Sequence, residues 1–451
     1  MAKLPLQGVR VVDSTYVFAL PYTGALLADL GADVIKVEGP GRPDVTRPGG
    51  YAGSFPENEI GEDWWNRGST YNLLHRGKRS LTLDLTTDRG RDLFRDLVNV
   101  SDVVMENYTP RVMRRWGLDY PGLRAVKPDI IMVSNTGYGH GEGPYSGYPA
   151  QATTQEGTHG HCWVTGYHGG PPSKVGASYV DFLSTWTALF AIGAALRHRN
   201  LTGEGQWVDL AMYQAGVMFI SEYLMDSQVN GRPGSRIGNR HQYRAPQGCY
   251  PAKGEDRWIV LSAGTDGQWR ALCGLMGKHH LAEDPRFSGN PGRMKNHDEL
   301  DAIIGDWTRG QDRYDLMEQL QSVGIPAGPV FDNRDTHLDP HFKARGFLEY
   351  VSHPPDRGIG TRPFIGRPYK FSKSPVKIQG HTPAFGEHNG PVLKDLLGVG
   401  DAEYGRMEQE GTISPVPTTG EPVLPDSIEE QLHKGRISGW DPDYKTQLGI
   451  P

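Results

Sequence analysis

Cysteine is scarce in this chain, and long apolar runs are missing. The 451 residues include three cysteines, far apart at Cys162, Cys249 and Cys273. Because this set is odd and sparse, and no pair has metal-ligand spacing, we expect a reducing, cytoplasmic location and no bound metal. No apolar stretch is long and uninterrupted enough to predict a membrane span, and no apolar signal core follows Met1.

Other signatures are missing as well. The formal net charge of −6 lacks the basic excess typical of nucleic-acid-binding domains. After a first predicted strand at 9–12, residues 13–16 read Asp-Ser-Thr-Tyr, where a dinucleotide-binding chain would have Gly-x-Gly-x-x-Gly. The chain has no Walker loop. These absences disfavour a nucleic-acid partner and a nicotinamide cofactor.

What the sequence does contain is an alternation of strand-like and helix-like segments. The predicted strands are short apolar or alternating runs at 9–12, 34–38, 80–85, 103–105, 130–133 and 207–210. Residues 20–30, 90–100, 182–196 and 212–225 have helical spacing. Apolar strands separated by helices favour a mostly parallel sheet covered on both faces, so we predict an α/β fold with a Rossmann-like large domain.

Turn-rich stretches divide the chain. We place the first part of the large domain at 1–227, followed by a smaller α+β domain at 228–330, which opens with a Gly- and Pro-containing linker. Residues 331–395 are expected to return and complete the large domain. The polar C-terminal tail, 396–451, either wraps the surface or is partly disordered.

Two basic clusters flank predicted strands, at 75–79 and around Arg115. Guanidinium and ammonium groups there would suit phosphates, but the residues alone favour a solvated basic face. The turn at 134–139 follows a strand and suits either a ligand or an ordinary connection. We discount His159-Gly160-His161-Cys162 as a metal site, because its alternate residues have no distant ligand partners.

Asp181 stands just before the strongest predicted helix. Helix capping explains an aspartate at this position without any function. A catalytic interpretation uses the same physics, since a helix N-terminus favours an ionised carboxylate, and an ionised carboxylate can attack a thioester.

Several ordered segments decide between these interpretations. These segments are residues 5–13, 27–38, 77–85, 106–108, 202–209 and 324–330. Together they resemble the class III coenzyme A transferases of the CaiB/BaiF type, which include formyl-CoA transferase. The resemblance covers about residues 5–396. It implies that coenzyme A (CoA) moves from an acyl-CoA to a small carboxylic acid, and that the two chains of a homodimer interlock.

The resemblance also implies residue roles. Asp181 takes the position of the family's nucleophile, which forms an aspartyl anhydride and then an aspartyl-CoA thioester. CoA is then a substrate, and no cofactor is bound permanently. The implied CoA contacts are His75, Arg76, Lys78, Asn107, Tyr108, Arg115, Thr136, Gly137 and Tyr138.

Departures from formyl-CoA transferase bear on the substrate. Phe18 stands where that enzyme has Gln, Gly39 where it has Arg, and residues 240–248 replace its glycine-rich active-site loop. Formate and oxalate chemistry is therefore disfavoured. The segment 147–156 is similar to that of transferases for larger acids, such as succinyl-CoA:benzylsuccinate CoA-transferase. Whether residues 240–248 gate the site stays open.

Two alternatives remain. Acyl-CoA racemases of the same fold place a His-Asp pair where this chain has Ala150-Gln151, and racemisation needs such a base beside the α-carbon. A non-catalytic subunit of a heteromeric transferase is the other alternative, and retention of Asp181 argues against it.

Overall fold

The computed structural model describes residues 3–48, 54–176 and 178–450. The chain forms two compact units. Unit 1 comprises Met1–His159, Gly176–Phe219 and Leu338–Pro451, and unit 2 comprises Gly160–Val175 and Ile220–His337. The sequence predicted that the chain leaves the large domain after residue 227 and returns to it at residue 331. In the structure these two boundaries fall after Phe219 and after His337. Sequence patterns gave no sign that 160–175 belongs with the smaller unit.

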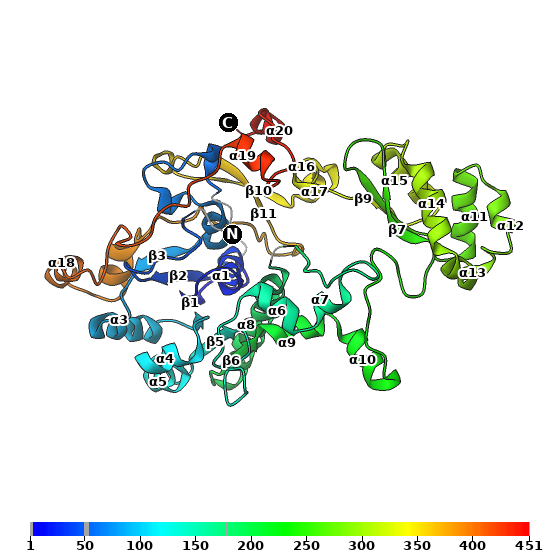
Figure 1. The fold of residues 1–451 in the computed structure, drawn as a ribbon. Coiled ribbons are helices and arrows are strands. Elements are labelled where there is room, and N and C mark those ends of the chain that lie inside the picture. Colours follow the sequence, from blue (N-terminus) through cyan, green and yellow to red (C-terminus); the bar gives the residue numbers. More distant parts are fainter. Residues whose placement is uncertain (1–2, 49–53, 177, 451) are drawn as a thin grey trace. The chain divides into compact units, whose positions relative to one another are not determined.

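A six-stranded sheet forms the centre of unit 1 (Figure 1). Its order is β3-β2-β1-β4-β5-β6, and all neighbouring strands are parallel. The predicted parallel α/β architecture is confirmed. The strands are β1 (Arg10–Ser14), β2 (Asp33–Glu38), β3 (Arg79–Thr82), β4 (Val103–Glu106), β5 (Ile131–Thr136) and β6 (Trp207–Ala211).

Helices cover both faces of this sheet. On one face, α1 (Ala19–Asp29) and α8 (Tyr179–Thr202) pack Leu27 and Ile192 against the strands. On the other face, α3 (Asp88–Asn99) buries Phe94. Because the helices after β1 and β3 lie on opposite faces, β1 and β4 flank a topological switch point, where open α/β sheets bind ligands.

The remaining elements of unit 1 are mostly short. Those before β6 are α2 (Ser69–His75), α4 (Pro110–Trp116), α5 (Tyr120–Val126) and α6 (Ala152–Thr158), and α9 (Met212–Met218) follows β6. The return segment contains α17 (Pro340–Arg345), the hairpin of β10 (Leu348–Ser352) and β11 (Thr361–Ile365), and the π-helical turn Pro391–Leu396. Short 3-10 turns lie at Pro56–Asn58, Trp64–Asn66 and Pro355–Arg357.

Unit 2 has its own core. Its antiparallel sheet has the order β7-β8-β9, and Trp269 and Leu300 pack with Ile259 beneath it. The strands are β7 (Gln247–Pro251), β8 (Trp258–Ser262) and β9 (Ala327–Pro329). Its helices are α7 (His161–Val164), α10 (Ser221–Asn230), α11 (Asp266–Leu275), α12 (His280–Glu283), α13 (Gly289–Lys295), α14 (His297–Thr308) and α15 (Arg313–Ser322), and α16 (Asn333–Leu338) lies at its end.

Two helix predictions need correction. The single helix expected at 212–225 is two helices, α9 and α10, because the backbone leaves the helical region at Ile220 (φ −115°, ψ 23°). Helix α8 starts before Asp181 and runs for 24 residues, so it is long and apolar enough to meet the criterion for a membrane span, which the sequence analysis did not expect. Ala188 and Ile192 nevertheless bury this helix against the sheet of unit 1.

The C-terminal tail packs on unit 1. Helix α18 (Asp401–Gln409) buries Met407, and Ile413 joins the same core cluster as Phe94. The Thr82 hydroxyl donates to the Ser414 carbonyl over 2.8 Å. Further along lie α19 (Ile428–His433) and α20 (Tyr444–Leu448). The tail was predicted either to wrap the surface or to be partly disordered; its described residues belong to unit 1 and make these contacts there.

Candidate active site

The carboxyl ends of β1 and β4 meet at the switch point, and Asn107 joins them. Its side-chain oxygen accepts from the Tyr16 amide over 2.8 Å, and its amide nitrogen donates to the Tyr16 carbonyl over 2.6 Å. The Tyr108 ring lies 5.6 Å from that of Tyr16. Val17, the next residue, has a φ of 73°, which is strained for a β-branched side chain. The structure thus brings the predicted pair 107–108 to the sheet edge beside a strained loop.

The turn after β5 also lies at this edge. The Thr136 hydroxyl accepts from the Gly139 amide over 2.9 Å, which fixes the turn. A Cβ added to Gly137 would lie 2.2 Å from the Cβ of Ala150, so only glycine fits here. The Tyr138 ring packs 5.4 Å from that of Tyr213. The predicted residues 136–138 therefore connect the sheet edge to the segment leading into α6.

Arg115 lies on α4, directly after the turn at 107–108. Trp116 packs its ring 5.5 Å from that of Tyr108, which holds α4 to the end of β4. The Arg115 side chain is exposed, and within the described part of the chain it forms no ion pair. It is available to an anionic group at this edge.

The side chains of His75, Arg76 and Lys78 are not brought to the surface. Arg76 pairs with Asp29 over 2.9 Å, and Lys78 pairs with Asp13 over 2.7 Å, all of them buried. Burial lowers the pKa of Lys78 to about 8 and that of His75 well below its usual value. Buried carboxylates need partners, and these cations provide them. The basic side chains of this segment therefore have internal partners.

Asp181 is the third residue of α8, and Ser178 is the N-cap. The helix therefore begins three residues earlier than the sequence indicated, and capping does not account for Asp181. The Thr185 hydroxyl donates to the carbonyls of Asp181 (2.9 Å) and Ala19 (2.7 Å). Phe182 packs 5.1 Å from the Phe18 ring. These contacts fix the first turn of α8 against α1.

Burial raises the pKa of Asp181 to about 7, although a hydrogen bond with Ser178 works in the opposite direction. The negative charge of Glu156 contributes to the increase. A helix terminus favours an ionised carboxylate, as expected from the sequence, but desolvation disfavours the charged form of Asp181 more strongly and raises its pKa instead. Near neutral pH, both protonation states of Asp181 are populated.

Gln155 and Glu156 on α6 were missed by the sequence analysis. Both side chains are fully buried. Only their place at the end of the segment 147–156 pointed to them, because a sequence does not show which polar side chains will be buried.

Just beyond these residues, His159 Nε2 lies 2.9 Å from the Tyr179 hydroxyl. In the described ranges, no three His, Cys, Asp or Glu side chains are placed to hold a metal ion.

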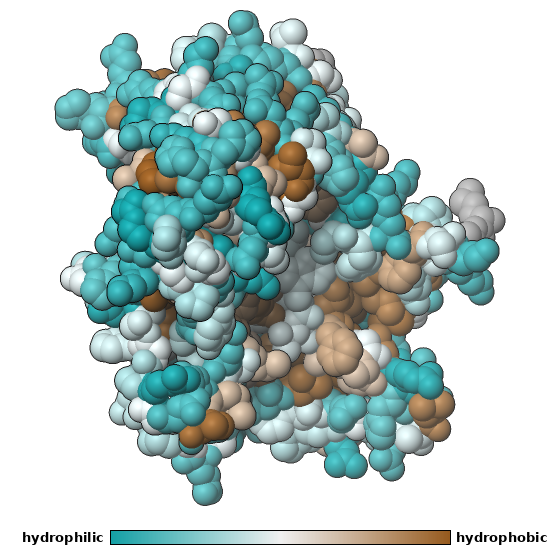
Figure 2. All heavy atoms as spheres, turned by 90° about the vertical axis from the view of Figure 1, so that its right-hand side faces the viewer, coloured by the Kyte–Doolittle hydropathy of each residue, from teal (hydrophilic) through white to brown (hydrophobic). Residues whose placement is uncertain are grey.

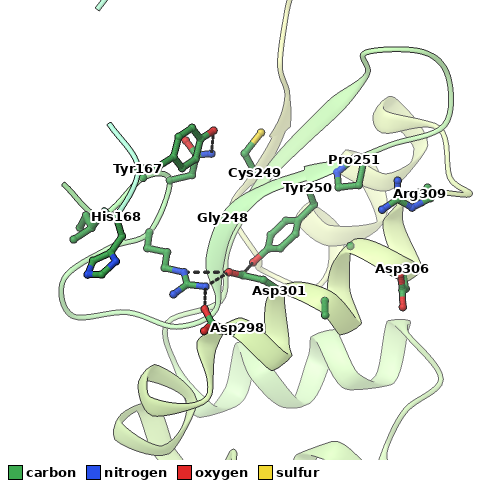
Figure 3. Close-up of a pocket in the computed structure, with 16 residues that line it drawn as sticks. Tyr167, His168, Gly248, Cys249, Tyr250, Pro251, Asp298, Asp301, Asp306 and Arg309 are labelled. Atoms are coloured by element: carbon green, nitrogen blue, oxygen red, sulfur yellow. Dashed lines mark hydrogen bonds and ion pairs between the residues drawn. The ribbon is translucent and has the colours of Figure 1, made fainter. Parts of the chain in front are cut away.

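A pocket of about 630 Å³ lies within unit 2 (Figure 3). Arg240, from the 240–248 segment, donates to Asp301 over 2.6 Å, and Tyr250 donates to the same carboxylate over 2.8 Å. None of the residues predicted for catalysis or CoA binding lines this pocket. The candidate active site is therefore the edge of the sheet in unit 1.

Comparison with known proteins identifies the family. The sequence profile described as CoA-transferase family III matches residues 6–389. The chain belongs to CoA-transferase family III. Both the family and the enzyme class predicted from the sequence are confirmed.

Relatives of this CoA-transferase agree in length and fold. It is 35% identical to a succinate–glutarate CoA-transferase of Agrobacterium fabrum, covering 87% of this chain and 96% of the relative. It is 33% identical to a succinyl-CoA–D-citramalate CoA-transferase of Chloroflexus aurantiacus, covering 91% and 98%. The crystal structure of a CAIB/BAIF family protein from Brucella suis is 34% identical, with a TM-score of 0.78, and covers 87% of this chain and all of that one.

Proposed function

We propose that this CoA-transferase moves CoA from succinyl-CoA to a carboxylic acid, with Asp181 as the nucleophile. The observation that carries the proposal is a half-buried carboxylate, fixed at the start of α8 beside α1, in a chain of this family. Several relatives carry succinyl-CoA in their names, which supports it as the donor.

The proposed chemistry starts with the ionised carboxylate. An Asp181 oxygen attacks the thioester carbonyl, the C–S bond breaks, and CoA leaves as a thiolate. The thiolate then attacks the aspartyl carbonyl of the mixed anhydride, which releases the donor acid and leaves an aspartyl-CoA thioester. The acceptor carboxylate attacks this thioester, and the freed thiolate finally attacks the new acyl group, which restores Asp181. No proton is consumed, and exclusion of water preserves the thioester's energy.

For CoA we propose contacts along the sheet edge. Arg115 is exposed and suits a phosphate, while Asn107, Tyr108 and the turn at 136–138 border the same edge. The segment containing His75, Arg76 and Lys78 would contribute through its backbone, since its side chains are internally paired.

We also propose the interlocked homodimer. Large apolar side chains remain on the surface, as Figure 2 shows for one face of the molecule. In unit 1, Phe190 on α8 is 79% exposed and Met218 on α9 is 74% exposed. Exposed apolar side chains of this size are typical of surfaces that contact another chain.

The experiment pairs Asp181→Ala with a control. Wild-type protein is incubated with succinyl-CoA and a panel of carboxylic acids, and the acyl-CoAs formed are measured by mass spectrometry. We expect Asp181→Ala to reduce transfer by roughly 10³-fold or more, because the nucleophile is gone. Asp88→Ala should keep wild-type activity, since Asp88 also lies in the first turn of a helix but its side chain is 95% exposed.

Other outcomes separate the alternatives. Near wild-type transfer by Asp181→Ala contradicts the proposal. Deuterium exchange at the α-carbon of an acyl-CoA, without movement of CoA, would indicate a racemase. A chain that binds CoA but never forms a hydroxylamine-sensitive adduct would be a non-catalytic subunit.

A further inference from the structure

Helix α6 places two polar side chains in the interior with nothing in the described chain to bind them. Gln155 and Glu156 are both 0% exposed. Their four terminal nitrogen and oxygen atoms have no hydrogen-bond partner among the described residues. A buried carboxylate or amide without a partner is costly, so such groups are retained where a further polar group meets them.

These side chains border the proposed reaction centre. A Cβ added to Gly137, in the turn after β5, would lie 3.2 Å from Gln155 Nε2. The charge of Glu156 acts on Asp181. Helix α6 packs against α8, and His159 at its end contacts Tyr179, the first residue of α8. Gln155 therefore borders the strand-end turn, and Glu156 lies near enough to Asp181 for its charge to act there.

We propose that Gln155 and Glu156 form a subsite for a hydroxyl group on the transferred acyl chain, so that the enzyme selects hydroxycarboxylic acids. The inference rests on the proposed function, because it names the acid that Asp181 serves. A hydroxyl group can donate to the Glu156 carboxylate and accept from Gln155 Nε2 at the same time. An ammonium group donates but cannot accept, and an alkyl group does neither. Sites built to bind a substrate hydroxyl discriminate strongly against the analogue that lacks it.

The test compares matched acids with succinyl-CoA as the fixed donor. The pairs are lactate and propionate, 3-hydroxybutyrate and butyrate, and malate and succinate, with 3-aminobutyrate as the ammonium analogue. For wild-type enzyme we expect kcat/KM to favour the hydroxy acid in at least one pair by roughly 10- to 100-fold. Glu156→Gln should reduce that ratio at least about tenfold. The ratio is taken within one variant, so a change in the ionisation of Asp181, which affects both acids alike, cancels. Glu142→Gln is the control, because Glu142 is exposed in the same connection between β5 and α6.

Three results would each overturn the subsite. They are equal kcat/KM for hydroxy and unsubstituted acids, a preference for 3-aminobutyrate, and an unchanged ratio of kcat/KM between the paired acids in Glu156→Gln. If Glu156→Gln does not fold, as judged by circular dichroism, Gln155→Met is put to the same comparison. If no acid accepts CoA, the proposed function fails separately. The subsite is then judged by calorimetric titration of the hydroxy acids: binding lost in Glu156→Gln supports it, and equal binding or none overturns it.

Discussion

A carboxylate that attacks a thioester must be ionised, and burial of Asp181 opposes ionisation. With its pKa at about 7, the reactive fraction increases with pH through neutrality. We therefore expect log kcat/KM to rise with a slope near one below pH 7 and to level off above it. Initial rates measured from pH 5.5 to 8.5 with a saturating acceptor provide the profile. A profile that stays flat down to pH 5.5 would contradict this assignment.

The same shift affects stability, which gives a measurement independent of turnover. The folded pKa lies above the unfolded value of 3.8, so between these values the folded chain retains a proton that the unfolded chain has lost. Stability contributed by this group therefore falls as pH rises over that interval. Asp181→Asn removes this effect. The free energy of unfolding of the variant, relative to that of wild type, should therefore increase by up to about 1.4 kcal/mol per pH unit between pH 4 and 7. Thermal melts of freshly prepared protein at pH 5 and pH 8 compare the two.

Residue-scale prediction from sequence had a clear limit. Family motifs singled out Asp181 and the 107–108 pair, whose roles stay predictions, but the directions of side chains could not be obtained from such motifs. Arg76 and Lys78 look like a phosphate-binding cluster in sequence, yet their carboxylate partners lie 47 and 65 residues away. Such distant pairing sets which charges are buried, and no local pattern contains it.

At the scale of elements, Thr185 joins α1 to α8 next to Asp181, the proposed nucleophile. Thr185→Val keeps the shape but removes the hydroxyl that joins the Ala19 and Asp181 carbonyls. We expect a loss of about 1 kcal/mol in the free energy of unfolding. We also expect a lower kcat with little change in KM, because the first turn of α8 is less well fixed. Urea denaturation and steady-state kinetics measure the two effects.

Thr185→Ser is the matched control, since it restores the hydroxyl in a smaller side chain. It should recover most of the lost kcat. If Val and Ser variants have the same kcat as wild type, the bridge does not position Asp181.

Element prediction succeeded where periodicity was strong. The central strands are short apolar runs, and all six were found within a few residues. The break between α9 and α10 was missed because residues 212–225 keep helical spacing across it. The start of α8 was placed late because Tyr179 and Val180 carry no N-terminal signal of their own.

At the scale of the whole molecule, the tail has two parts that differ in what they bury. Val399, Met407 and Ile413 belong to the core cluster on one face of the sheet. After Gly420 the chain has mostly exposed or half-buried side chains, with Leu424 73% exposed. The extent of this packing could not be read from a polar sequence in which the apolar residues are widely spaced.

Two truncations distinguish these parts. Ending the chain after Leu397 removes three core side chains worth about 1.5–3 kcal/mol each, a sum comparable with the whole stability of a typical domain. It also removes the Ser414 backbone that bonds Thr82 on β3. We expect that chain to be insoluble or to lack a cooperative melt. Ending after Gly420 retains those contacts and should lower the melting temperature by only a few degrees. Equal stability of the two truncated chains, measured by differential scanning calorimetry, would show that the segment 398–420 is not part of the core.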